Sequence, residues 1–224
     1  MTTRDKTFHY FLAFLLTWAS ISVAFAEEYS CKETGETHIW ISPLNPKAKG
    51  QIKIMAVSTD GPVSELALID DQDRRIPLET SRRGGPPWSL STQLETINEG
   101  SYRVVAERDG HLSACHPLTI DGSGTQEKSE VWGLATEAFY SAWIEALFGA
   151  PPEENLSFSS LTPVLQNSDR NFLYNHLGVN EDKKLSLTPD CADLPYTLRT
   201  YFAWKVGLPI AFRACGRGSA KTSP

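Results

Sequence analysis

The sequence predicts an α+β fold, in which an N-terminal antiparallel β-sandwich is followed by a mostly helical C-terminal segment. Two changes of pattern indicate this. Apolar residues partly alternate with polar ones in short runs over residues 27–120, which is typical of strands. Over residues 131–209 they recur at the helical spacing i, i+3, i+4, i+7. The polar, glycine-containing stretch between them, residues 121–130 (DGSGTQEKSE), is expected to be a linker.

Residues 1–26 are expected to be a cleaved signal peptide. Arg4 and Lys6 precede an apolar run, and the run ends in the small-residue motif AFA at Ala26. The run is short for a membrane span. We therefore expect cleavage after Ala26, a secreted or periplasmic protein, and no stable membrane span after cleavage.

The β-sandwich is predicted from short runs rich in β-branched and aromatic residues, separated by turn signals such as GGPP and DG. Five such runs are expected to be strands: residues 37–42, 51–58, 64–69, 101–108 and 112–120. Short strands at this spacing are typical of an antiparallel sandwich. Residues 94–110 (LETINEGSYRVVAERDG) resemble a late-strand hairpin of immunoglobulin-like domains, in which a tyrosine packs at the corner between the sheets. The resemblance implies that Tyr102 has this place and that the sandwich is immunoglobulin-like.

The chain has four cysteines, Cys31, Cys115, Cys191 and Cys215. An even number in an exported protein suggests disulfides, and four cysteines allow three full pairings. Cys31 precedes the first predicted strand and Cys115 lies in the last, so both belong to the sandwich. We therefore expect a disulfide between Cys31 and Cys115, while Cys191 and Cys215 can be paired or free.

The C-terminal segment is expected to contain four helices, at residues 131–148, 162–166, 169–177 and 190–206. Gly149 ends the first, and Gly207 ends the last. Residues 210–224 are expected to be a loose tail.

A cysteine stands at the predicted start of the last helix, in the stretch TPDCADLPYTLRTYFAWKVGLP. With Asp190 as the N-cap, the helix dipole would favour the thiolate of Cys191 and make it a potential nucleophile. The carboxylates of Asp190 and Asp193 disfavour a thiolate at Cys191, because like charges repel. Cys191 also shares a helix face with Leu198 and Phe202, so it can equally be a small core residue. Spacing alone leaves both interpretations open.

Residues 190–209 resemble the nucleophile helix of the papain-like superfamily, in particular its NlpC/P60 and transglutaminase-like branches. Members have a cysteine at the start of a helix, a small or acidic residue after it, and a helix that ends in Gly-Leu-Pro or Gly-Ile-Pro. The resemblance implies that Cys191 is the nucleophile and that a general-base histidine lies on a sheet after the helix. No histidine follows Cys191 in this sequence. Either the chain is shortened relative to such proteins, or the base lies upstream as in circularly permuted members, where His176 is the nearest candidate.

Other residue patterns narrow the candidate sites and partners. Asp190, Asp193, Tyr196 and Trp204 are candidate binding residues for a peptide or glycan. The net charge of −6 without a basic stripe argues against nucleic acid as a partner. We expect no cofactor and no metal site, since phosphate-binding and dinucleotide-binding motifs are missing and the histidines lack a second ligand cluster.

The sequence favours two candidate functions. The first is a bacterial cell-envelope cysteine hydrolase of NlpC/P60 type that cleaves peptide or amide bonds, with peptidoglycan peptides as candidate substrates. The alternative is a non-catalytic periplasmic binding or adaptor protein, in which the β-sandwich recognises an envelope protein. A histidine within hydrogen-bond reach of Cys191 would distinguish the enzyme from the adaptor.

Overall fold

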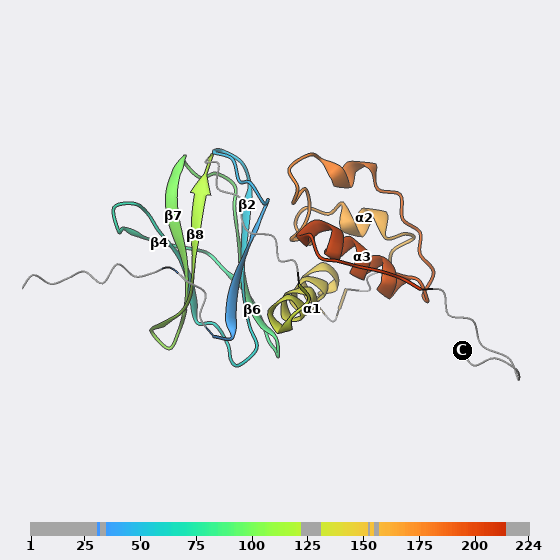
Figure 1. Cartoon of the computed structure of the whole chain (residues 1–224), viewed down its shortest axis with the longest axis horizontal. Coiled ribbons are helices and arrows are strands. Elements are labelled where there is room, and N and C mark those ends of the chain that lie inside the picture. The colour runs from blue at the N-terminus through green and yellow to red at the C-terminus, as the bar shows by residue number, and fades with distance from the viewer. Residues whose placement is uncertain (1–30, 32–34, 122–130, 152, 155–156, 214–224) are drawn as a thin grey trace, which may run out of the picture. The chain divides into compact units, whose positions relative to one another are not determined.

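The computed structural model describes residues 31, 35–121, 131–151, 153–154 and 157–213. The predicted signal peptide, nearly all of the linker and most of the tail lie outside these ranges. The described residues form an α+β fold with two antiparallel sheets of four strands each, followed by α1 (Leu134–Phe148), α2 (Thr162–Leu165), the 3₁₀ helix η1 (Glu181–Lys184) and α3 (Leu194–Val206) (Figure 1). Among these helices, none has both the length and the apolar character needed to cross a membrane.

The two sheets differ in strand order. The first has the order β1-β2-β6-β5 and the second β4-β3-β7-β8. The strands are β1 (Thr37–Ser42), β2 (Ile52–Ser58), β3 (Glu65–Ile69), β4 (Arg75–Pro77), β5 (Ser81–Arg83), β6 (Trp88–Leu94), β7 (Gly100–Arg108) and β8 (His111–Ile120). The five strands expected from the sequence correspond to β1, β2, β3, β7 and β8, so these predictions are confirmed.

The strand β6 was not predicted, although it pairs with both β2 and β5 inside the first sheet. Its sequence WSLSTQL is largely polar, and Leu90 is its only apolar residue that is fully buried. Ser89 and Thr92 are also buried, and the hydroxyl of Thr92 donates a hydrogen bond to the carbonyl of Glu79. The apolar residues Trp88, Leu90 and Leu94 keep the period of a strand, but the other four residues are polar.

The sheets face each other across one apolar core. The first sheet contributes residues such as Ile39 and Ile54, and the second contributes Leu66, Val104 and Leu118. All of these side chains are buried. The alternation of the predicted strands therefore places one face of each sheet in a shared core.

The strand β2 is buried on both faces, which explains why its sequence IKIMAVS has few polar residues. Ile54 and Ala56 belong to the core between the sheets. Met55 and Val57 point the other way and belong to a second core, formed with the helices. Helix α1 contacts β2 over the same face, and Figure 1 shows α1 beside the sheet that contains β2 and β6.

Aromatic side chains fill the core between the first sheet and the helices. Phe139 of α1 stacks on Trp40 of β1, with ring centroids 4.3 Å apart and planes 6° apart. Phe139 also contacts Phe172 edge to face and Phe202 of α3 at a tilt. Because sheet and helices share this core, the described residues from Cys31 onward form one compact unit.

The predicted disulfide between Cys31 and Cys115 is present. It joins the chain before β1 to the middle of β8, across 84 residues of sequence. It packs with Ala67 and Val105, which face away from the core between the sheets. The bond therefore covers the outer face of the second sheet.

The predicted C-terminal ends of α1 and α3 are confirmed, but both helices begin later than expected, at Leu134 and Leu194. Gly149 follows α1, and Gly207 follows α3 in the left-handed conformation, at φ 74°. The helix expected at residues 169–177 is wrong, since this stretch forms successive turns. The side chain of Asn171 accepts the N–H of Leu173, and Asn175 is left-handed at φ 52°, so regular helical hydrogen bonding is interrupted.

Candidate functional site

Asp190 caps the chain at the entry to α3. Its carboxylate Oδ1 accepts hydrogen bonds from the N–H groups of Ala192 and Asp193, both at 2.8 Å. Regular helix begins only at Leu194, later than expected, and residues 191–193 form a turn. Pro195 has no N–H to donate to the carbonyl of Cys191, which contributes to the late start.

Cys191 is exposed and carries a free thiol. Leu198 and Phe202 are buried as the helical periodicity predicts, but Pro195 and Cys191 lie on the exposed first turn of the same face. The interpretation of Cys191 as a small core residue is therefore wrong. Cys215 lies outside the described residues.

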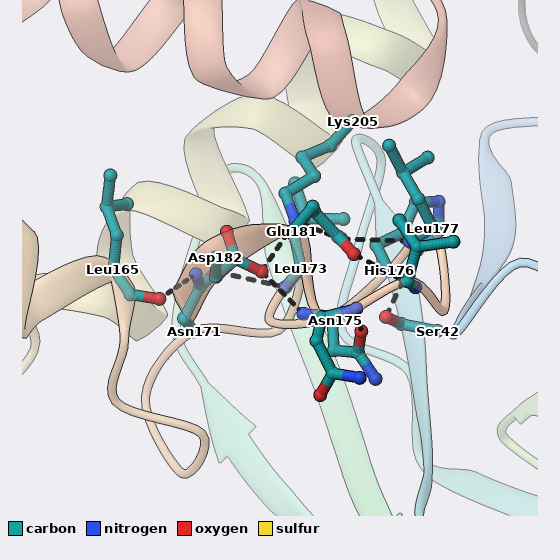
Figure 2. Close-up of polar contacts among 12 residues, drawn as sticks. Ser42, Leu165, Asn171, Leu173, Asn175, His176, Leu177, Glu181, Asp182 and Lys205 are labelled. Atoms are coloured by element: carbon teal, nitrogen blue, oxygen red, sulfur yellow. Dashed lines mark hydrogen bonds and ion pairs between the residues drawn. The ribbon is translucent and has the colours of Figure 1, made fainter. Parts of the chain in front are cut away.

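His176 is packed into the molecule. Its side chain is 5% exposed, and its ring Nδ1 lies 3.0 Å from the hydroxyl of Ser42 at the end of β1 (Figure 2). Its carbonyl accepts the N–H of Leu44 at 2.7 Å. Over the described ranges, no hydrogen bond joins the Cys191 thiol to a histidine. His176 thus connects the turns after α2 to the first sheet, while Cys191 stands at the exposed start of α3.

Three of the four predicted binding residues line one open groove of about 960 Å³. Asp193 and α3 residues that include Tyr196 and Trp204 form one wall, and residues 185–189, Phe212 and Arg213 line the rest. The side chains of Tyr196 and Trp204 are 61% and 45% exposed, which is unusual for large aromatic residues. Asp190 caps the helix instead of lining the groove.

A buried polar network lies behind the groove, and Figure 2 shows its centre. Lys205 of α3 extends its ammonium to the carboxylates of Glu181 and Asp182, with a distance of 2.6 Å to Asp182 Oδ2. Asp182 Oδ1 accepts the hydroxyl hydrogen of Tyr201 at 2.7 Å, and the Asn171 amide donates to the oxygen of Tyr201 at 2.9 Å. Each of these buried polar groups is therefore hydrogen-bonded.

This network sets the protonation of its members. Burial and the adjacent carboxylate of Asp182 raise the pKa of Tyr201, so its hydroxyl remains a donor. Burial alone would raise the pKa of Glu181, but hydrogen bonds from Lys205 and the N–H of Leu177 outweigh it and hold that pKa below its usual value. Glu181 is therefore a carboxylate at neutral pH.

The network also fixes the groove. Glu181 and Asp182 lie in η1, directly before residues 185–189, whereas Lys205 and Tyr201 lie in α3. Their ion pairs thus hold the two walls of the groove at a fixed separation. These residues were not predicted, although one signal was present: Lys205 lies four residues after Tyr201 and three after Phe202, on the buried face of α3.

A second buried lysine connects the sheet to the helical segment. Lys53 of β2 donates hydrogen bonds from Nζ to the carbonyls of Ser168 and Asn171, the latter at 2.8 Å. Burial lowers the pKa of Lys53 to about 8, against the attraction of Asp169 and Asp182. The charged form is held by the two carbonyl oxygens and by these acidic neighbours.

No group of three or more histidine, cysteine, aspartate or glutamate side chains in the described part of the chain could hold a metal ion. No protein-family model matches the chain, and no curated protein matches it significantly. The candidate site is therefore defined by geometry: an aromatic groove on an α+β protein, with an exposed thiol near one end of its helical wall.

Proposed function

We propose that the protein is an exported, non-catalytic binding module of the bacterial cell envelope that takes a peptide segment in the groove along α3. The exposure of Tyr196 and Trp204 in one groove carries this proposal. Exposed aromatic side chains in a concave site are typical anchors for a partner, because they offer a large apolar area at low entropic cost. A firmly held wall on each side reduces the cost of ordering the site on binding.

The two sheets support an immunoglobulin-like assignment for the N-terminal part. Their orders β1-β2-β6-β5 and β4-β3-β7-β8 correspond to the ABED and C′CFG sheets of such domains. The hydroxyl of Tyr102 in β7 donates to the carbonyl of Asn98 at 3.2 Å, as expected for a tyrosine corner. Domains of this class are common on cell surfaces, which agrees with an envelope role.

Export is supported by the disulfide between Cys31 and Cys115. Such bonds persist in oxidising compartments and are rare in the cytosol. The predicted signal peptide at residues 1–26 agrees with the same location.

Peptide binding is tested with a phage-displayed library of random dodecapeptides, selected on the protein. The tightest synthetic peptide is then titrated by calorimetry against the wild type and two variants, Tyr196→Ala and Trp204→Ala. Removing an anchor of this kind costs about 2 kcal/mol, so Kd should rise roughly thirtyfold. The control is Leu112→Ala, an exposed apolar residue of β8 outside the groove, which should leave Kd unchanged. Equal affinity of all four proteins would refute the groove as the binding site.

The second candidate function is a cysteine hydrolase with the papain-like nucleophile helix. It is favoured by the exposed free thiol of Cys191, two residues from the groove-lining Asp193. A catalytic thiolate should be alkylated rapidly by iodoacetamide near pH 6, and the rapid phase should vanish in Cys191→Ser. Slow alkylation at pH 6 that accelerates only above pH 8 would exclude this function for the protein.

A further inference from the structure

One wall of the groove, residues 185–189, belongs to no helix or sheet and makes its backbone hydrogen bonds through Leu185 and Leu187. Leu185 has φ −65° and ψ 139°, and Thr188 precedes Pro189, which disfavours helical conformation at Thr188. Side-chain exposure alternates along this wall: Ser186 and Thr188 are exposed, whereas Leu185, Leu187 and Pro189 are half-buried. These observations indicate an extended backbone over residues 185–189.

Hydrogen bonds are made on the side away from the groove. The carbonyl of Leu187 accepts the N–H of Leu161 at 3.1 Å, and its N–H donates to the hydroxyl of Thr162 at 2.8 Å. Successive residues of an extended chain direct their N–H and C=O groups to opposite sides. The groups of Ser186 and Thr188 therefore point away from Leu161 and Thr162, neither of which lines the groove. No hydrogen bond within the described ranges engages the groups of Ser186 and Thr188.

We propose that the groove binds an extended peptide by strand addition to the edge formed by residues 185–189. This inference rests on the proposed peptide-binding function and specifies its mode. In antiparallel pairing, two peptide residues spaced two apart exchange N–H···O bonds with Ser186 and Thr188, which uses two donors and two acceptors. Alternate peptide side chains then face α3, where Tyr196 and Trp204 accept apolar groups.

The dimensions of the two walls agree with such a ligand. Tyr196, Thr200 and Trp204 line the groove at i, i+4 and i+8 of one helix, so this wall spans about 12 Å. Four residues of an extended peptide span about 13 Å. The expected ligand is thus a segment of about four residues with alternating apolar side chains, and without proline at the paired positions.

The test uses the selected dodecapeptide described above. Each of its amides is N-methylated in turn, which removes one backbone donor at a time. Strand addition predicts that methylation weakens binding about tenfold at alternate positions and has little effect between them. If binding depends on Trp204 but methylation shows no alternation, strand addition is wrong while the proposed function stands. If no selected peptide depends on Tyr196 or Trp204, both are wrong.

A protein variant gives a matched second test. Ser186→Pro removes one N–H from the edge, and Leu185 already has the extended ψ that a following proline requires. Its Kd should rise about fivefold or more, whereas Ser186→Ala, which retains the N–H, should stay within about twofold. Far-ultraviolet circular dichroism and the melting temperature check that both variants fold.

Amide hydrogen exchange of the wild-type protein tests strand addition without any substitution. Saturating peptide should slow exchange at Ser186 and Thr188, since their N–H groups become paired. Unchanged exchange at both amides would overturn strand addition. Self-association of the protein that Ser186→Pro abolishes, seen by sedimentation, would identify a second copy of the chain as the occupant and would also overturn the proposal.

Discussion

Lys205 lies at the centre of the buried network, and its replacement by methionine tests whether the network holds the groove walls together. The variant Lys205→Met keeps an unbranched side chain but leaves the carboxylates of Glu181 and Asp182 without their cation. Their side chains are 5% and 1% exposed, so solvent cannot replace the lost partner. Removing one partner of a buried ion pair costs about 3–5 kcal/mol. This is a large fraction of the stability of a typical domain, about 5–15 kcal/mol.

Urea unfolding followed by tryptophan fluorescence measures this loss. The control is Lys183→Met in η1, whose side chain is exposed, and it should change the unfolding free energy by less than about 0.5 kcal/mol. A loss below about 1 kcal/mol in Lys205→Met would refute the structural role of the network.

The pH dependence provides an independent check on the same variant. In the wild type the pKa of Glu181 is held below its usual value of 4.5, so its contribution to stability is present above that pH and is lost as pH falls further. Without Lys205, burial should raise the pKa of Glu181 above that of the wild type. The difference between wild type and variant should therefore shrink as pH is lowered from 7 towards 4. A constant difference over this range would contradict the assignment.

Three further predictions concern the connections elsewhere in the fold. Cys115→Ser removes the disulfide that spans 84 residues and should lower the unfolding free energy by about 4–5 kcal/mol. A reductant should destabilise the wild type by a similar amount and should leave the stability of the variant unchanged. Lys53 has a pKa lowered from 10.5 to about 8, so between these values the unfolded chain binds more protons and stability should rise with pH. Lys53→Met should lack that rise in urea titrations, and identical profiles would contradict the burial of the ammonium. Phe139→Ala should cost about 3–5 kcal/mol, because the ring is 1% exposed between Trp40 and α3. The control Leu134→Ala, on the exposed side of α1, should cost less than about 0.5 kcal/mol, and comparable losses in both would be inconsistent with the shared core.

Features that depend on neighbouring residues could be predicted from the sequence. The alternation in residues 37–42 and 112–120 predicted β1 and β8, because one face of each strand meets a core. Gly207 predicted the end of α3, since glycine enters the left-handed conformation without steric cost. The cap formed by Asp190 could also be predicted, because its carboxylate accepts hydrogen bonds from N–H groups only two and three residues further on.

Other elements could not be predicted, because their partners lie far away in sequence. The polar strand β6 is held by β2 and β5 on either side. Residues 169–177 have a helical composition, but side-chain contacts of Asn171 replace helical hydrogen bonds there. Of the candidate site, the sequence indicated Asp193, Tyr196 and Trp204 as binding residues, but not the groove that joins them.

The sequence by itself determined the positions of β1, β2, β3, β7 and β8, the cysteine pair Cys31–Cys115 and the end of α3, since these follow from periodicity, position and backbone preference. Only the tertiary structure decided that β2 is buried on both faces, that Cys191 is exposed, and that Lys205 lies among carboxylates 23 and 24 residues away. Burial and ion pairing depend on which distant segments pack together. Which segments pack together depends on the whole core, so it cannot be inferred from short-range sequence patterns.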